Sequence, residues 1–107
     1  MAEFVRVASV AEIEPGGVKR VEVDGEPIAI VNLDGEFYAI GDTCTHEEAS
    51  LSEGWVDAEE ETIECPLHGS QFKIKTGEVL SLPAVYPVQT YEVKVDGDAI
   101  LVKIREE

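Results

Sequence analysis

Residues 41–70 read GDTCTHEEASLSEGWVDAEEETIECPLHGS and contain the side chains that decide the fold. Both cysteines and both histidines of the 107-residue chain lie in this stretch, grouped as Cys44-Thr45-His46 and Cys65-Pro66-Leu67-His68. Each group offers one thiolate and one imidazole, and glycine and other turn-forming residues flank both groups. Two such loops lying side by side would form a single site with two sulfur and two nitrogen ligands.

More than one metal centre suits this ligand set. Two cysteines and two histidines form many structural zinc sites, whose ligand pairs are usually separated by about two to four residues. Only Thr45 separates Cys44 from His46, which is tight for two ligands of one tetrahedral ion. In a [2Fe–2S] centre of mixed ligation, two histidines replace two cysteines on one of the irons. The spacing therefore argues against a single zinc ion, and zinc and an iron–sulfur cluster both stay open at this point.

Outside this stretch, apolar runs alternate with turn signals. Asp-Gly pairs stand at positions 24–25, 34–35 and 96–97, and Asp-Gly between apolar runs predicts a hairpin because both residues tolerate positive φ. Residues 9–12 have the spacing of a capping box and predict one short helical turn. The apolar runs predict strands at Phe4–Ala8, Val18–Val23, Ile28–Leu33, Glu36–Ile40, Tyr91–Val95 and Ala99–Ile104, with shorter strands at Thr62–Cys65 and Gln71–Ile74.

These elements predict an all-β fold in which short antiparallel strands close into a barrel or a sandwich. The length of 107 residues suits one domain, and no repeat or linker divides residues 1–107. The less regular residues from about 41 to 87 are predicted to be inserted into this β base and to hold the metal site.

The charge of the chain limits its partners. It carries 23 acidic and 8 basic residues, a net charge of −15. Such a surface repels phosphate backbones and anionic lipids, which argues against nucleic acid and membranes and favours a basic protein partner. The alternative is that the charge only maintains solubility. No apolar run of membrane-spanning length occurs, and residues 1–15 lack the apolar core of a signal peptide, so we expect a cytoplasmic protein.

The connector between the two ligand groups is strongly acidic. Because it joins both loops, part of it is expected near the site, where its charge would oppose reduction and steer a basic partner. The alternative is a solvated loop. Leu51 and Trp55 within it are predicted to be packing residues. The eight acidic residues of the connector are Glu47, Glu48, Glu53, Asp57, Glu59, Glu60, Glu61 and Glu64, and it has no basic residue.

These motifs resemble those of the Rieske ferredoxins, small carriers that supply electrons to bacterial ring-hydroxylating oxygenases. The resemblance rests on residues 42–46, 51–54 and 65–69 and on the late Pro83, and it covers nearly the whole chain. It implies a Rieske-like fold with a cluster-binding subdomain made of two ligand loops and a proline loop. It also implies one Rieske [2Fe–2S] cluster, with Cys44 and Cys65 on one iron and His46 and His68 on the other.

The resemblance also assigns roles to residues around the ligands. Gly69 would let the backbone approach a sulfide, or would serve only as a turn glycine. Ser70 would donate a hydrogen bond to a bridging sulfide and raise the potential, as in respiratory Rieske proteins. Leu82 and Pro83 would cover the cluster, unless the proline merely ends a strand. Respiratory proteins have a tyrosine where this chain has Phe72. They also carry an additional cysteine in each loop and a membrane anchor, and because this chain shows neither, the low-potential, soluble branch is favoured.

The function that follows is one-electron transfer. Rieske oxygenases need a second iron held by two histidines and a carboxylate, and both histidines of this chain are already used. The chain would therefore be no enzyme but a monomeric carrier between a flavin-dependent reductase and a terminal oxygenase. Two alternatives stay open: the Rieske-like small subunit of a nitrite reductase, and a zinc-stabilised binding module.

Overall fold

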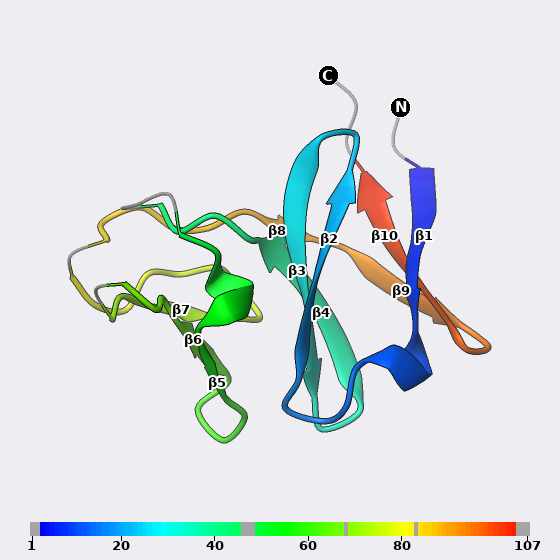
Figure 1. The fold of residues 1–107 in the computed structure, drawn as a ribbon, viewed down its shortest axis with the longest axis horizontal. Helices are drawn as coiled ribbons and strands as arrows, with labels where there is room; N and C mark the ends of the chain where they lie inside the picture. Colours follow the sequence, from blue (N-terminus) through cyan, green and yellow to red (C-terminus); the bar gives the residue numbers. More distant parts are fainter. Residues whose placement is uncertain (1–2, 46–48, 68, 83, 105–107) are drawn as a thin grey trace.

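The computed structural model describes residues 3–45, 49–67, 69–82 and 84–104. Figure 1 shows its antiparallel strands, which form sheets in the orders β1-β10-β9, β2-β3-β4-β8 and β5-β6-β7. Two 3₁₀ turns, at Val10–Glu12 and Leu51–Glu53, accompany them. The strands are β1 (Glu3–Ser9), β2 (Val18–Val23), β3 (Glu26–Leu33), β4 (Glu36–Gly41), β5 (Trp55–Asp57), β6 (Thr62–Glu64), β7 (Gln71–Lys73), β8 (Thr90–Tyr91), β9 (Val93–Asp96) and β10 (Ala99–Ile104).

All three hairpins predicted from Asp-Gly pairs are present. Asp24 and Gly25 have φ of 52° and 81° and connect β2 to β3, and the Asp34-Gly35 turn between β3 and β4 repeats this geometry. The third hairpin is displaced by one residue, because Asp96 is still paired with Ala99 in the ladder. Its two central residues are therefore Gly97, with φ of 64°, and Asp98.

The strand predicted at residues 91–95 is in fact two strands. Tyr91 in β8 pairs with Ala39 in β4, whereas Val93 in β9 pairs with Val102 in β10. The chain crosses from one sheet to the next at Glu92. Both Tyr91 and Val93 pack against the same apolar cluster. The alternation of inward and outward side chains therefore continues across the change of sheet, and the sequence pattern does not reveal that change.

Strand β3 separates two cores. Its residues 28–33 are all buried, because both faces of the strand are covered. Ile28 and Ile30 join a cluster with Ile100 and Val102 of β10. Ala29 and Val31 face the other way, into a cluster that contains both cysteines. The described strands form a sandwich-like arrangement and no closed barrel. Of the two predicted forms, barrel and sandwich, the structure therefore has the sandwich.

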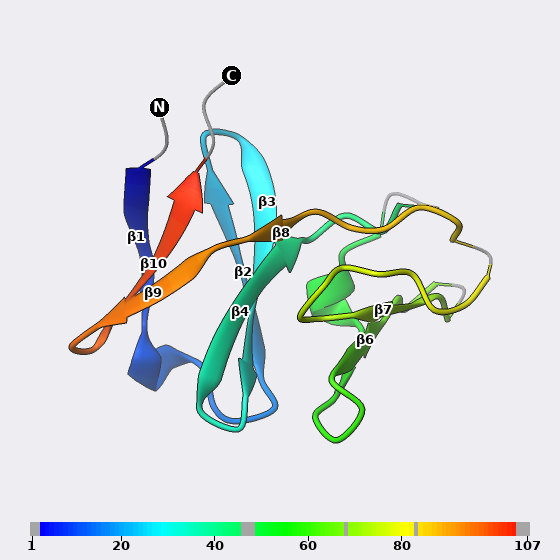
Figure 2. The same cartoon turned by 180° about the vertical axis from the view of Figure 1, so that it is seen from behind.

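The chain leaves the base sheets after Gly41 and returns to them at Thr90. Between these points it forms the β5-β6-β7 sheet, which lies to one side of the base in both views (Figures 1 and 2). No helix in the part of the chain that the structure describes is long and apolar enough to cross a membrane.

Candidate metal centre

Cys44 begins a loop that is closed by backbone pairing. Its N–H donates to the carbonyl of Ala49 at 2.9 Å, and Thr43 pairs with Ser50 in an isolated antiparallel bridge. The side chain of Cys44 is buried. His46, the second predicted ligand of this loop, lies outside the described residues, as do Glu47 and Glu48.

Cys65 begins the second loop, directly after β6. Its N–H donates to the carbonyl of Ser70 at 2.8 Å, and the N–H of Gly69 donates to the carbonyl of Cys65 at 3.2 Å. Gly69 has φ of 75°, which favours glycine over any residue with a Cβ atom. This geometry fits a turn glycine, and the role of Gly69 beside a sulfide stays a prediction. His68, predicted as the fourth ligand, lies outside the described residues.

The two thiols suit a shared soft metal group. Cys44 and Cys65 are 3% and 1% exposed and belong to the same apolar cluster. No disulfide joins them. Thiolates buried in one cluster at the heads of two loops suit two of the four ligand positions of an iron–sulfur cluster. The described ranges, which omit both histidines, contain no group of three His, Cys, Asp or Glu side chains placed to hold a metal ion.

A third segment, which begins at Ser81 and contains Leu82, Ala84 and Tyr86, is tied to both loops. The hydroxyl of Thr45 donates to the carbonyl of Tyr86 at 2.7 Å, which connects this segment to the first loop. The N–H of Ala84 donates to the hydroxyl oxygen of Ser70 at 3.1 Å, which connects it to the second. Pro83 lies outside the described residues, and Leu82 is 75% exposed. The sequence predicts no role for Thr45 or Tyr86, because only the folded chain brings these distant positions together.

The first loop is anchored to the base by a buried charge. Asp42 is 1% exposed, and its carboxylate accepts the N–H of Ser52 at 2.8 Å. Its second oxygen lies 3.2 Å from Nε of Arg20, on β2. Because Asp42 is two residues before Cys44, this ion pair fixes where the loop begins.

Gly54 allows the turn before β5 to lie against β6. A Cβ atom at this position would be 1.8 Å from the carbonyl oxygen of Glu64 and 3.2 Å from Cδ of Pro66. The backbone φ of −91° is open to any residue, so contact, and not conformation, requires glycine here. The close approach of Gly54 holds the segment that leads into Cys65.

The surface around the loops is apolar. Large hydrophobic side chains are exposed in the second loop and in the third segment, an arrangement typical of a protein contact surface. We call this group the apolar rim. It consists of Leu67, Leu82, Val85 and Tyr86, which are 57%, 75%, 60% and 68% exposed.

The acidic connector contains both ion-paired and solvent-exposed carboxylates. Glu61 pairs with Lys75 at 2.9 Å, and its hydrogen bond raises the pKa of the Lys75 ammonium. Asp57, Glu59 and Glu60 are exposed near the β5–β6 turn. Of the two predicted packing residues, Leu51 is fully buried, but the prediction for Trp55 is wrong, because its side chain is 62% exposed.

The chain matches the family model of the Rieske [2Fe-2S] domain over residues 3–92. It is 40% identical over 101 residues to the ferredoxin component of biphenyl 2,3-dioxygenase from Rhodococcus jostii (strain RHA1), which covers 94% of this chain and 92% of that protein. It is 44% identical over 97 residues to the 3-phenylpropionate/cinnamic acid dioxygenase ferredoxin subunit of Shigella flexneri serotype 5b (strain 8401), with coverage of 91% and 90%.

Solved structures with similar folds include the ferredoxin of carbazole 1,9a-dioxygenase from Nocardioides aromaticivorans IC177. Its TM-score is 0.89 at 43% identity, over 92% of this chain and 95% of that one. A chain from a complex of reduced oxygenase and oxidized ferredoxin in carbazole 1,9a-dioxygenase has a TM-score of 0.86 at 39% identity, with coverage of 92% and 91%. A putative NADH-dependent nitrite reductase small subunit from Mycobacterium tuberculosis reaches 0.87 at 23% identity, over 100% and 99%, and shares the fold alone.

Proposed function

The chain belongs to the Rieske [2Fe–2S] domain family, and on that premise we propose that it is the ferredoxin component of a ring-hydroxylating dioxygenase system. It carries one electron at a time and catalyses no reaction itself. The observation that supports this best is the placement of two buried thiols in one apolar cluster, each at the head of a closed loop. Relatives that are 40% and 44% identical over more than nine-tenths of the chain are ferredoxin components.

The ligands of the Rieske cluster are proposed to be Cys44 and Cys65 on one iron and His46 and His68 on the other. The bound cluster supplies a one-electron couple whose potential is raised by the neutral imidazole ligands. The chain buries both thiolates among apolar side chains, which excludes water from them. Both loops stay in place because backbone hydrogen bonds close each of them, and because the Asp42–Arg20 pair anchors the first.

The residues proposed to surround the cluster are Gly69, Ser70, Leu82 and Pro83. Ser70 is fully buried, and its oxygen already accepts the N–H of Ala84. Its hydroxyl proton is thus available to donate to a sulfide, which stabilises the reduced state. Leu82 and Pro83 are proposed to screen the site from solvent within the third segment.

The proposed electron donor is a flavin-dependent reductase, and the proposed acceptor is a terminal oxygenase. A similar ferredoxin is known in complex with the oxygenase of carbazole 1,9a-dioxygenase. In this chain the apolar rim around the loops would supply the centre of the contact, and basic residues of the partners would face the acidic surface. We further propose that the chain acts as a monomer in the cytoplasm.

The alternatives have weaker support. The similarity to a nitrite reductase small subunit concerns the fold, at 23% identity, against 40–44% for the dioxygenase ferredoxins. A zinc-stabilised module does not agree with the match to the Rieske domain model over residues 3–92.

A titration under anaerobic conditions tests the proposal. Dithionite should reduce the holoprotein with one electron per cluster. Mixing the reduced protein with the oxidised terminal oxygenase of biphenyl dioxygenase should restore the oxidised spectrum, more slowly at high salt because charge screening weakens the encounter. Reoxidation at the same rate in buffer without the oxygenase would argue against a carrier for this class of acceptor.

A further inference from the structure

The outer face of the β5-β6-β7 sheet is open to solvent at one end, around Trp55, while Thr62 on the same face is buried. Trp55, Glu64 and Gln71 stand opposite one another on the three strands. The next residues in β6 and β7, Ile63 and Phe72, are fully buried in the opposite direction. Because side chains alternate along a strand, the first three share the outer face. The only tryptophan of the chain thus lies on a solvent-facing sheet surface.

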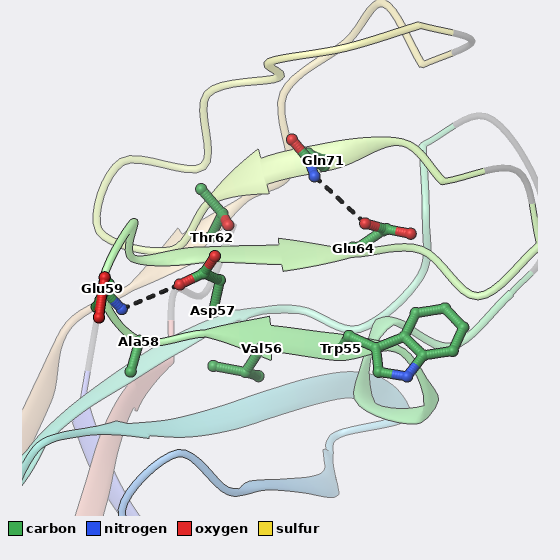
Figure 3. Close-up of a pocket in the computed structure, with 8 residues that line it drawn as sticks. All are labelled: Trp55, Val56, Asp57, Ala58, Glu59, Thr62, Glu64 and Gln71. Carbon is green, nitrogen blue, oxygen red and sulfur yellow. Dashed lines mark hydrogen bonds between the residues drawn. The ribbon is translucent and has the colours of Figure 1, made fainter.

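A hollow in this face is lined by acidic and neutral residues, and the same face carries the exposed Lys73, opposite Thr62. The hollow, of about 600 Å³, opens beside the Trp55 indole, and Figure 3 shows that ring next to the Glu64 carboxylate on the neighbouring strand. None of the described residues that line the hollow is basic. The lining residues are Trp55, Val56, Asp57, Ala58, Glu59, Thr62, Glu64 and Gln71.

The carboxylates of the hollow retain capacity to accept hydrogen bonds. Among the described residues, Glu64 accepts a hydrogen bond from the Gln71 side-chain amide, at 3.2 Å from Oε1. Asp57 accepts the backbone N–H groups of Glu59 and Glu60 through a single oxygen, Oδ1. A carboxylate has about four lone-pair sites, so both groups can bind a further donor.

We propose that this face binds an arginine side chain presented by a redox partner protein, in a contact beside the one made at the apolar rim. The inference rests on the proposed function, because the occupant is a partner of the electron carrier. An exposed indole attracts a cation to its ring face, and arginine more often than lysine. A guanidinium also pairs with a carboxylate through two parallel hydrogen bonds, which an ammonium cannot form. Trp55 and Glu64 together therefore match arginine.

The position of the face supports a partner that also contacts the loops. Glu64 directly precedes Cys65 in the chain, so the hollow begins where the second loop begins. A protein interface of ordinary size involves about 20–30 residues on each partner, which is many more than the four side chains of the apolar rim. A partner seated on the rim would reach the edge of this sheet and gain a second, charge-dependent contact.

A peptide titration of the oxidised holoprotein tests the proposal. The probe is acetyl-Gly-Arg-Ala-Arg-Gly-amide, and two matched peptides carry lysine or the neutral isostere citrulline in place of arginine. Binding is followed by the indole N–H signal of Trp55 and the amide signal of Glu64 in ¹⁵N-labelled protein. The arginine peptide should shift both signals and saturate, the lysine peptide should bind about threefold more weakly, and the citrulline peptide should leave the signals unmoved.

Variants locate the site. Glu64→Gln and Trp55→Leu should each weaken arginine-peptide binding about fivefold, the second followed by the Glu64 amide. Asp98→Asn is the matched control, because it removes an exposed carboxylate from the β9–β10 hairpin on the opposite side of the molecule (Figures 1 and 2). It should leave the affinity unchanged. Equal binding of lysine and arginine, binding of citrulline, no saturable shift, or equal affinity of all variants would overturn the proposal.

The iron content and the midpoint potential separate this inference from the proposed function. Trp55→Leu should retain the iron and the potential of the unmodified protein, because its side chain points away from the buried core. A holoprotein that is reducible but binds no arginine peptide disproves the docking face and leaves the electron carrier intact. A protein without a cluster disproves the proposed function itself.

Discussion

The N–H of Ala84 donates a hydrogen bond to Oγ of Ser70 at 3.1 Å, and both residues are buried. The bond connects the end of the second cysteine loop to the third segment. Because the Ser70 oxygen accepts this bond through a lone pair, its O–H proton points away from Ala84 and can be donated to another acceptor. One side chain thereby has a structural role and a proposed electronic role.

Ser70→Ala should lower the reduction potential. The proposed hydroxyl donor to the cluster is lost, and the reduced, more negative state loses that stabilisation. The buried N–H of Ala84 also loses its acceptor, which costs about 1–3 kcal/mol of folding free energy. Protein-film voltammetry and thermal unfolding measure the two effects.

Ser81→Ala separates these two roles. The Oγ of Ser81 accepts the N–H of Gln71 at 3.0 Å and connects the same two segments. Its loss should lower stability by a similar amount and leave the potential unchanged. A Ser70→Ala midpoint equal to that of the unmodified protein would remove the electronic role.

Gly54→Ala should destabilise the protein by about 3 kcal/mol or more, because the new methyl group would overlap the carbonyl oxygen of Glu64. Gly41→Ala is the matched control. Its Cβ would meet nothing closer than Gln89 at 3.9 Å, so the change should stay within about 1 kcal/mol. Urea unfolding followed by circular dichroism gives both values, and equal values would refute the close approach of the two backbones.

Arg20→Gln should destabilise the first loop. The substitution leaves the buried Asp42 carboxylate without its cation, at a cost of about 1–3 kcal/mol. We also expect faster loss of visible absorbance from the holoprotein on warming. Lys19→Gln is the control, because Lys19 pairs with Glu12 on the surface, and such pairs contribute about 0–1 kcal/mol. An unchanged rate of absorbance loss in Arg20→Gln would show that the ion pair does not hold the loop.

Stability should fall at alkaline pH through Tyr91. Partial burial, and then the hydrogen bond that Tyr91 donates to Glu26 at 3.0 Å, raise its pKa from 10.0 to about 12. Between these values the folded state keeps a proton that the unfolded state releases, so unfolding becomes easier as pH rises. Because the ring is partly exposed, we expect the free energy of unfolding to fall by about 1 kcal/mol over this pH range. Tyr91→Phe should flatten the dependence in urea unfolding at pH 8–12, and parallel curves would contradict the assignment.

The sequence predicted the structural features that depend on residues adjacent in the chain. The Asp-Gly hairpins and the two cysteine loops are present because turn geometry is decided by adjacent residues. Sequence-based prediction missed the short strand β5, which depends on its pairing with β6. The exposure of Trp55 was also missed. An aromatic residue in a sequence is expected to be buried, and the sequence does not show which face of the sheet is open to solvent.

Contacts between distant positions were beyond prediction. The Thr45–Tyr86 bond joins residues that only the complete fold places together. The crossing at Glu92 depends on which sheet each half of the run pairs with, and alternation alone is the same for both.

Iron, sulfide and zinc analysis of the purified holoprotein tests the central claim most directly. A Rieske cluster predicts two iron atoms and two acid-labile sulfides per chain, no zinc, and loss of both iron and sulfide in Cys44→Ser and Cys65→Ser. A colourless protein with one zinc ion per chain and no sulfide would contradict the account.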